Sequence, residues 1–161
     1  MDETIEIHVP VEDDGKAIVS IAASTSLFTE EEVATVKELW DDFIVSHDNK
    51  DDYQFLAAYK NGVMAGFSCY GHRALTRSTY DLYWIAVDNR LQHHGIGKLL
   101  LQATEEAIKK LGGTIIVVET STTEVYAPTR KFYIAQNYQV AGEIADFYEP
   151  GDGLMLFIKA L

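Results

Sequence analysis

Residues 80–98, which read YDLYWIAVDNRLQHHGIGK, decide the fold of this chain. The aromatic and β-branched run at 80–87 predicts a strand. A long helix is predicted over 95–111, ending at the glycine pair 112–113. Glycines at a helix start let the backbone approach a ligand closely, and the unpaired amides of the first turn donate towards it. The segment therefore predicts a site for a pyrophosphate group.

Two other phosphate-binding patterns compete for the same residues. A Walker loop needs Ser or Thr after Gly-Lys, but Leu99 follows Lys98. The dinucleotide fingerprint needs a third glycine where the chain has Leu100, although Glu119, 22 residues beyond Gly97, fits its acidic position. A nucleotide-dependent oxidoreductase therefore stays an alternative interpretation.

The rest of the chain carries further strand and helix patterns. Strands are predicted over residues 4–9, 53–59, 63–70, 114–119, 138–147 and 154–158, with helices beginning at 12 and 30 and another over 128–136. Thr29 before three glutamates is a helix-capping signal, and Asn61-Gly62 predicts a tight hairpin. This order predicts one mixed α+β domain over residues 1–161, with helices on the faces of a mixed sheet.

The charge balance excludes several classes of function. The net charge of −12 argues against general binding to a nucleic-acid backbone, which needs a basic face. No apolar run approaches the about 18 residues of a membrane span. Residues 1–60 hold 15 acids and 4 bases, so the acidity belongs to the front of the chain.

The cysteine content and the first residues point to a cellular location. Cys69 stands alone, which excludes an internal disulfide and a cysteine-rich metal site. The start Met1–Thr4 lacks the basic and apolar regions of a signal peptide. We therefore expect a cytoplasmic protein without a bound metal.

The glycine segment resembles a motif of a known family. Gln92–Gly97, after a strand ending Ile85–Asp88, is similar to the coenzyme A pyrophosphate motif of the GNAT superfamily of N-acetyltransferases. Tyr126–Tyr133 followed by Asn137-Tyr138 resembles the later motif of that family. The match covers about residues 80–148, and the element order extends it more loosely. The resemblance implies a GNAT-like fold with a central mixed, mostly antiparallel sheet flanked by helices.

The same resemblance implies acetyl-CoA as the co-substrate. In this family the loop amides hold the pyrophosphate, and the backbone of the preceding strand pairs with the pantetheine arm. The cofactor contacts that it implies are Ile85, Ala86, Val87, Gln92, His93, His94, Gly95, Ile96, Gly97, Lys98, Tyr126 and Arg130. Gln92 and Tyr126 depart from the Arg and Asn common in the family, and Arg130 is equally well explained as an exposed helix charge.

The resemblance also implies two catalytic residues. Tyr133 matches the tyrosine that protonates the departing thiolate in many members, although an aromatic anchor of the helix is the alternative explanation. Glu119 matches a position used as the general base, with Asp81, Glu124 or a water chain as alternatives.

The function expected from these residues is acetyl transfer from acetyl-CoA to a primary amine of a small molecule or protein, by direct attack in a ternary complex. A non-catalytic acyl-CoA-binding module on the same fold is the alternative. The acidic front helices favour a cationic acceptor, unless they serve only as a solvated surface. Dimers are common in the family, so a homodimer is one candidate assembly, and the sequence leaves the oligomeric state open.

Overall fold

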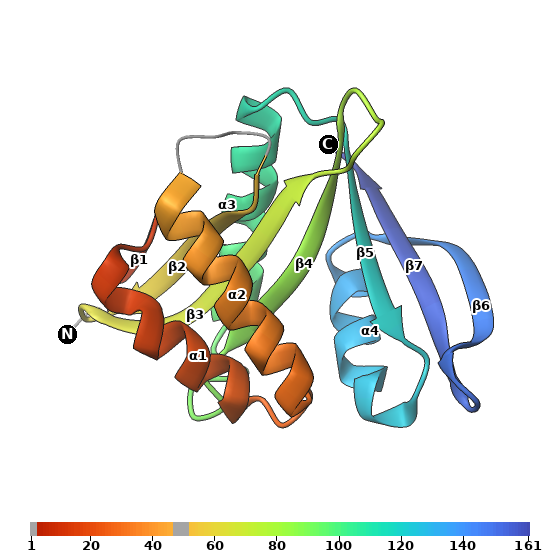
Figure 1. Cartoon of the computed structure of the whole chain (residues 1–161), viewed down its shortest axis with the longest axis horizontal. Coiled ribbons are helices and arrows are strands. Elements are labelled where there is room, and N and C mark those ends of the chain that lie inside the picture. Colours follow the sequence, from red (N-terminus) through yellow and green to blue (C-terminus); the bar gives the residue numbers. More distant parts are fainter. Residues whose placement is uncertain (1–2, 47–51) are drawn as a thin grey trace.

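One seven-stranded sheet organises residues 3–46 and 52–161, the part of the chain that the computed structural model describes (Figure 1). The strands are β1 (Ile5–His8), β2 (Gln54–Lys60), β3 (Val63–His72), β4 (Thr79–Val87), β5 (Ile115–Ser121), β6 (Gln139–Glu149) and β7 (Asp152–Ala160). Their order in the sheet is β1-β2-β3-β4-β5-β7-β6, and only the β4–β5 pair is parallel among these described strands. The predicted mixed, mostly antiparallel sheet is confirmed.

Four helices cover the sheet unequally within the described residues. α1 (Gly15–Ser24) and α2 (Glu30–Ser46) lie in front of β2, β3 and β4 and leave β5, β7 and β6 uncovered on that side (Figure 1). α3 (Ile96–Lys110) and α4 (Ala127–Ala135) pack behind the sheet. None of the described helices is long and apolar enough to cross a lipid bilayer.

Each face of the sheet has its own hydrophobic core. In front, Trp40 and Phe43 of α2 pack against Phe55, with ring centroids 5.4 and 5.3 Å from it. Behind, Tyr133 of α4 packs 5.8 Å from the ring of Phe157 on β7. The front core is therefore confined to the half of the sheet under α1 and α2, and the other half keeps an open front face.

The local signals in the sequence are confirmed where they depend on backbone geometry. Glu32 N–H donates to Thr29 Oγ1 at 3.1 Å, and Thr29 N–H donates to Glu32 Oε2 at 2.7 Å, so the capping box of α2 is formed. Asn61 and Gly62 both have positive φ, 51° and 79°, as a tight hairpin requires. Asn137 ends α4 with φ of 68°, in the left-handed conformation expected of it.

Two predicted boundaries are wrong. The first helix begins as a 3₁₀ turn, η1 (Glu12–Asp14), before α1 starts at Gly15. The last hairpin is longer than predicted, because only Pro150 and Gly151 form its turn and β7 already begins at the next residue. Asp146 Oδ1 accepts a hydrogen bond from Gly151 N–H at 2.7 Å, which stabilises this turn beside a bulge in β6.

The pairing of β4 fixes where a ligand can enter. β4 pairs with β5 only as far as Leu82 and Val118. Tyr83 is an extra residue in β4, because Cys69 of β3 pairs with Trp84 and the next residue of β3 pairs with Leu82. Beyond this bulge β4 stays with β3 and β5 stays with β7, so the two parallel strands diverge.

Candidate active site

The diverging end of β4 exposes one backbone edge. Ile85, Ala86 and Val87 pair on one side with Ser68, Phe67 and Gly66 of β3, and they have no described strand partner on the side of β5. A strand edge of this kind presents N–H and C=O groups that an extended ligand can pair with. The three residues predicted to contact a pantetheine arm therefore lie on the open edge.

The loop after β4 forms a cradle of backbone donors. Gly95 caps α3 with φ of 80°, and His93 adopts φ of 67°, unusual for a residue with a side chain. Within the described part of the chain, the N–H groups of residues 93–98 have no hydrogen-bond acceptor. Unpaired amides at a helix N-terminus are an anion-binding arrangement, and their number and placement suit a pyrophosphate.

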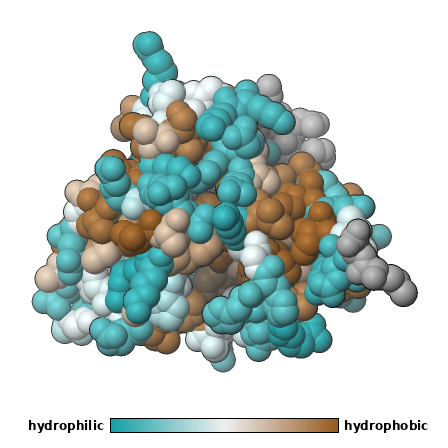
Figure 2. Space-filling model, turned by 180° about the vertical axis from the view of Figure 1, so that it is seen from behind, coloured by the Kyte–Doolittle hydropathy of each residue, from teal (hydrophilic) through white to brown (hydrophobic). Residues whose placement is uncertain are grey.

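The cradle opens into a hollow at the back of the molecule. A Cβ built on Gly97 lies 3.7 Å from Val87 and 3.8 Å from Phe132, so the start of α3, the end of β4 and α4 converge on one point. Seen from behind, the surface is hollowed below its centre, in the region between α3 and α4 (Figure 2). An extended ligand can therefore reach the open edge of β4 from behind.

The turn leading into the cradle is braced by side chains. Gln92 Nε2 donates to the carbonyl of Val87 at 3.3 Å. Asp88 accepts hydrogen bonds from Arg90 Nε at 3.0 Å and from its terminal nitrogen at 2.7 Å, and these bonds lower the pKa of Asp88. Gln92 therefore shapes the loop, whereas the exposed His93, His94 and Lys98 carry side chains that can face a phosphate.

Tyr133 lies behind the sheet, in the rear core. Its side chain is 3% exposed, and its ring lies 5.4 Å from those of Phe132 and Tyr138. Burial raises the pKa of this phenol, so it stays protonated throughout the physiological range. Its hydroxyl has no hydrogen-bond partner among the described residues, yet its oxygen is not one of their fully buried polar atoms, so a ligand can reach it.

Thr120 carries an unsatisfied hydroxyl near the same place. Side chains alternate along β5, so Thr120 shares the rear face with Ile116 and Val118, just beyond the last β4–β5 pair. Among the described residues, its Oγ1 is the one buried side-chain polar atom without a partner. Buried hydroxyls are normally paired, so this orphan fits a site completed by a ligand.

Arg130 and Tyr126 hold the loops around this rear site. The Nη1 of Arg130 donates to the carbonyls of Ser121 and Thr123, both at 2.8 Å. The hydroxyl of Tyr126 donates to the carbonyl of Leu27 at 3.2 Å, and burial raises its pKa to about 12. Both residues therefore have structural partners at the end of β5 and before α2.

Three charged residues meet on the front of the sheet. Arg73, in the loop before β4, contacts Asp81 at 2.7 Å and Glu119 at 3.7 Å. Partial burial raises the pKa of Asp81, with Glu119 adding to the rise and Arg73 opposing it. Glu119 is 44% exposed and accessible to a substrate, whereas Glu124 lies exposed in η2 (Glu124–Tyr126), outside the ion pairs of Arg73, Asp81 and Glu119.

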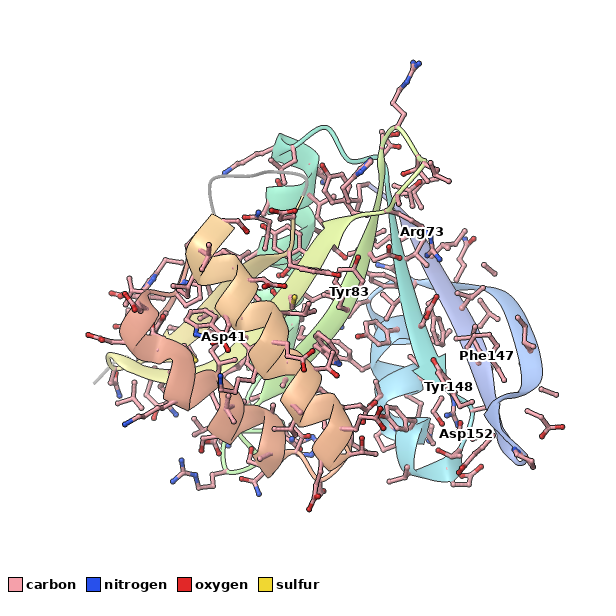
Figure 3. All side chains as sticks on the ribbon, viewed as in Figure 1. Asp41, Arg73, Tyr83, Phe147, Tyr148 and Asp152 are labelled. Carbon is pink, nitrogen blue, oxygen red and sulfur yellow. The ribbon has the colours of Figure 1, made fainter. Side chains whose placement is uncertain are left out.

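A cavity of about 460 Å³ adjoins this cluster on the uncovered half of the sheet. Its lining comes from the loop before β4 and from β5, β6 and β7, and comprises Arg73, Val117, Glu119, Ala141, Phe147, Leu154, Leu156 and Ile158. Figure 3 shows Arg73 and Tyr83 beside this face, with Phe147, Tyr148 and Asp152 along β6 and β7. The sequence prediction missed Arg73 and the cavity wall, because only the strand register brings them together.

Within residues 3–46 and 52–161, no group of three or more His, Cys, Asp or Glu side chains is placed to hold a metal ion. The side chains of the site offer a phenol, carboxylates and a guanidinium, and its backbone offers unpaired amides. This set can bind an anion, pair with an extended chain and move protons.

The sheet order and the divergence of β4 from β5 beside a helix N-terminus define an acyltransferase fold. The sequence profile of the acetyltransferase (GNAT) family matches residues 8–138. The chain therefore belongs to the GNAT family of acetyltransferases and is an acyltransferase. None of the curated protein sequences matches it significantly.

Solved structures agree with this assignment. An acetyltransferase of the GNAT family from Desulfovibrio desulfuricans is 33% identical, with a TM-score of 0.93 over 98% of this chain and 99% of that one. The ribosomal-protein-S18-alanine N-acetyltransferase of Escherichia coli is 19% identical, with a TM-score of 0.75 over 98% and 94%. The PaiA N-acetyltransferase of Thermoplasma acidophilum, in complex with coenzyme A, is 21% identical, with a TM-score of 0.73 over 95% and 98%. The last two structures have the same fold as this chain.

The unpaired hydroxyl of Thr120 should affect both folding stability and ligand binding. Thr120→Val should raise the free energy of unfolding without ligand by about 1 kcal/mol, because it removes a buried, unsatisfied group. The same change should weaken coenzyme A binding. Urea unfolding and calorimetric titration measure the two effects.

Thr104→Val is the matched control, since the Thr104 hydroxyl is fully buried but bonded to Leu100 O at 2.8 Å and to Ser68 Oγ at 2.7 Å. It should destabilise the protein by about 1–3 kcal/mol. A loss of stability in Thr120→Val as large as that in the control contradicts the interpretation of Thr120.

Proposed function

We propose that this protein is an acetyl-CoA-dependent N-acetyltransferase that acts through a ternary complex. The observation that carries the proposal is the gap where β4 diverges from β5. Different chemical groups lie behind this gap and in front of it. Behind the sheet lie the free amides of residues 93–98 and the phenol of Tyr133; in front lies Glu119 beside a cavity. In the proposed complex the thioester lies between the two strands, with Tyr133 on its rear side and Glu119 on its front side.

Backbone groups supply most of the proposed contacts to acetyl-CoA. The amides of 93–98 hold the pyrophosphate, with charge from Lys98 and hydrogen bonds from the side chains of His93 and His94. The edge of residues 85–87 pairs with the pantetheine arm, whose amides match a strand in hydrogen-bonding capacity. Tyr126 and Arg130 flank this arm and keep the loops at the ends of β5 in place.

The transfer itself needs one proton acceptor and one proton donor. Glu119 takes a proton from the acceptor ammonium, and the freed amine nitrogen attacks the thioester carbonyl carbon. The C–N bond forms, the C–S bond breaks, and the Tyr133 hydroxyl protonates the departing thiolate. The amide nitrogen then loses its second proton, which returns the Tyr133 oxygen to its protonated form. Arg73 holds Glu119 and Asp81 beside each other, so Asp81 remains the alternative acceptor of the proton.

We take residues 1–161 to act as one domain, because the cofactor cradle and the acceptor cavity use strands from both halves of the same sheet. The buried, unpaired Cys69 fits a reducing compartment such as the cytoplasm.

Removing the phenolic hydroxyl tests catalysis against binding. Tyr133→Phe should lower kcat by about 10²–10⁴-fold, the usual contribution of a general acid. The dissociation constant of acetyl-CoA should stay within about threefold, because the ring and its packing remain. Coenzyme A release over a panel of amines measures kcat. Acetyl-CoA binding without turnover of any amine by the wild-type protein indicates the non-catalytic module instead.

The pH dependence separates the two proton-transfer groups. Burial raises the pKa of Tyr133 above its ordinary value near 10, so its acid form persists and the wild-type rate should not fall between pH 7 and 9. Glu119→Gln should lower kcat/KM at least about tenfold at pH 7. This deficit should shrink towards pH 9, because the fraction of free amine rises about tenfold per pH unit below an amine pKa near 10.

Two further variants complete this test. Glu106→Gln, an exposed acid of α3 paired with Lys109 at 3.0 Å, should keep the wild-type profile. A Glu119→Gln deficit that is equal at every pH contradicts the role of Glu119 as proton acceptor. If Asp81→Asn instead shows the deficit in kcat/KM that shrinks towards pH 9, the proton acceptor is Asp81.

A further inference from the structure

The cavity beside Glu119 is apolar over most of its surface. Leu154, Leu156 and Ile158 alternate along β7 and form its floor, because alternate side chains of a strand share one face. Val117 on β5 and Phe147 on β6 bound it on opposite sides. No described helix covers this half of the sheet in front (Figure 1). Leu156 and Ile158 are half-buried and can be reached from outside, whereas Leu154 is 3% exposed.

Charge is concentrated at one edge of the cavity. Arg73 and Glu119 are the charged residues of its lining, and Arg73 contacts Asp81 at 2.7 Å and Glu119 at 3.7 Å. Glu119 makes the longer of these two contacts and is 44% exposed, so its carboxylate is the one on the cavity side that a cationic group can reach. Further along the front, Asp152 accepts a hydrogen bond from Ser121 Oγ at 2.5 Å, and Glu32 is engaged in the capping box of α2.

These features fit a molecule with one cationic end and an apolar body. A cavity of about 460 Å³ has the size of a small-molecule site. A polycation needs several carboxylates along its length, whereas this wall offers one next to six apolar side chains. The acidic front of the chain therefore does not by itself set the acceptor class.

We propose that the acceptor is a small primary amine with an apolar body, which lies on the floor of Leu154, Leu156 and Ile158 with its amino group at Glu119. The inference rests on the proposed function, since it names the substrate class of that site. Arg73 then orients Glu119 towards the amine and offsets part of the negative charge of Asp81 and Glu119.

A panel of three amines tests the acceptor class. The full chain is assayed with acetyl-CoA and 2-phenylethylamine, ethylamine or spermidine, and coenzyme A release gives kcat/KM. We expect 2-phenylethylamine to exceed ethylamine by at least about a hundredfold, because each buried methylene in an apolar pocket discriminates by 10-fold or more. Spermidine should be a poorer substrate than 2-phenylethylamine.

Matched variants place the selectivity in the cavity. Leu156→Asn should lower the ratio of the 2-phenylethylamine to the ethylamine kcat/KM at least about tenfold. Val140→Asn makes the same kind of change at a half-exposed residue of β6 that pairs with Phe157, outside the cavity lining, and should keep the wild-type ratio. Phe147→Ser repeats the test at a lining residue that is 51% exposed, where the fold tolerates the change.

The outcomes separate this inference from the proposed function. Preference for spermidine, or an unchanged ratio in both Leu156→Asn and Phe147→Ser, overturns the apolar acceptor and leaves N-acetylation standing. Absence of turnover with all three amines and with a peptide N-terminus overturns the proposed function, and the acceptor class with it.

Discussion

The divergence of β4 from β5 after Leu82 and Val118 is the constraint on which the rest of the site depends. Parallel strands that stayed paired to their ends would satisfy each other's backbone groups and leave no place for a ligand arm. The extra residue Tyr83 ends the pairing, and residues 85–87 keep an unpaired edge. The helix that follows turns its first amides towards the same opening, so strand edge and amide cradle form one continuous surface for an extended anionic ligand.

The sheet also separates two chemical environments. The rear side of the opening is packed and apolar, and burial there keeps Tyr133 protonated. The front side carries ionised groups in partial contact with water, where Arg73 bridges Asp81 and Glu119. A phenol that keeps its proton until the thiolate departs and a carboxylate that accepts a proton from the amine can therefore act on the same thioester from opposite faces.

Local sequence signals predicted the parts of the site that depend on backbone conformation. A few neighbouring residues determine the φ angles and amide contacts in such parts. Examples are the glycines after β4, Thr29 before α2 and Asn137 after α4. Arg73 has no such signal, because its ion pairs arise from the β3–β4 register and the parallel β4–β5 pair. The acceptor cavity likewise combines residues about 85 positions apart, from Arg73 to Ile158, and only the order β5-β7-β6 brings them together.

Hydrogen–deuterium exchange tests the central claim most directly, because it reports on the backbone groups that the divergence leaves open. Amides 93–98 lack acceptors in the described chain and should exchange fast without ligand. Saturating acetyl-CoA should slow exchange at 93–98 and along 85–87, and leave the exposed turn at Asn61 and Gly62 unchanged. Acetyl-CoA binding that leaves exchange at both segments unaltered would contradict the assignment of this opening as the cofactor site.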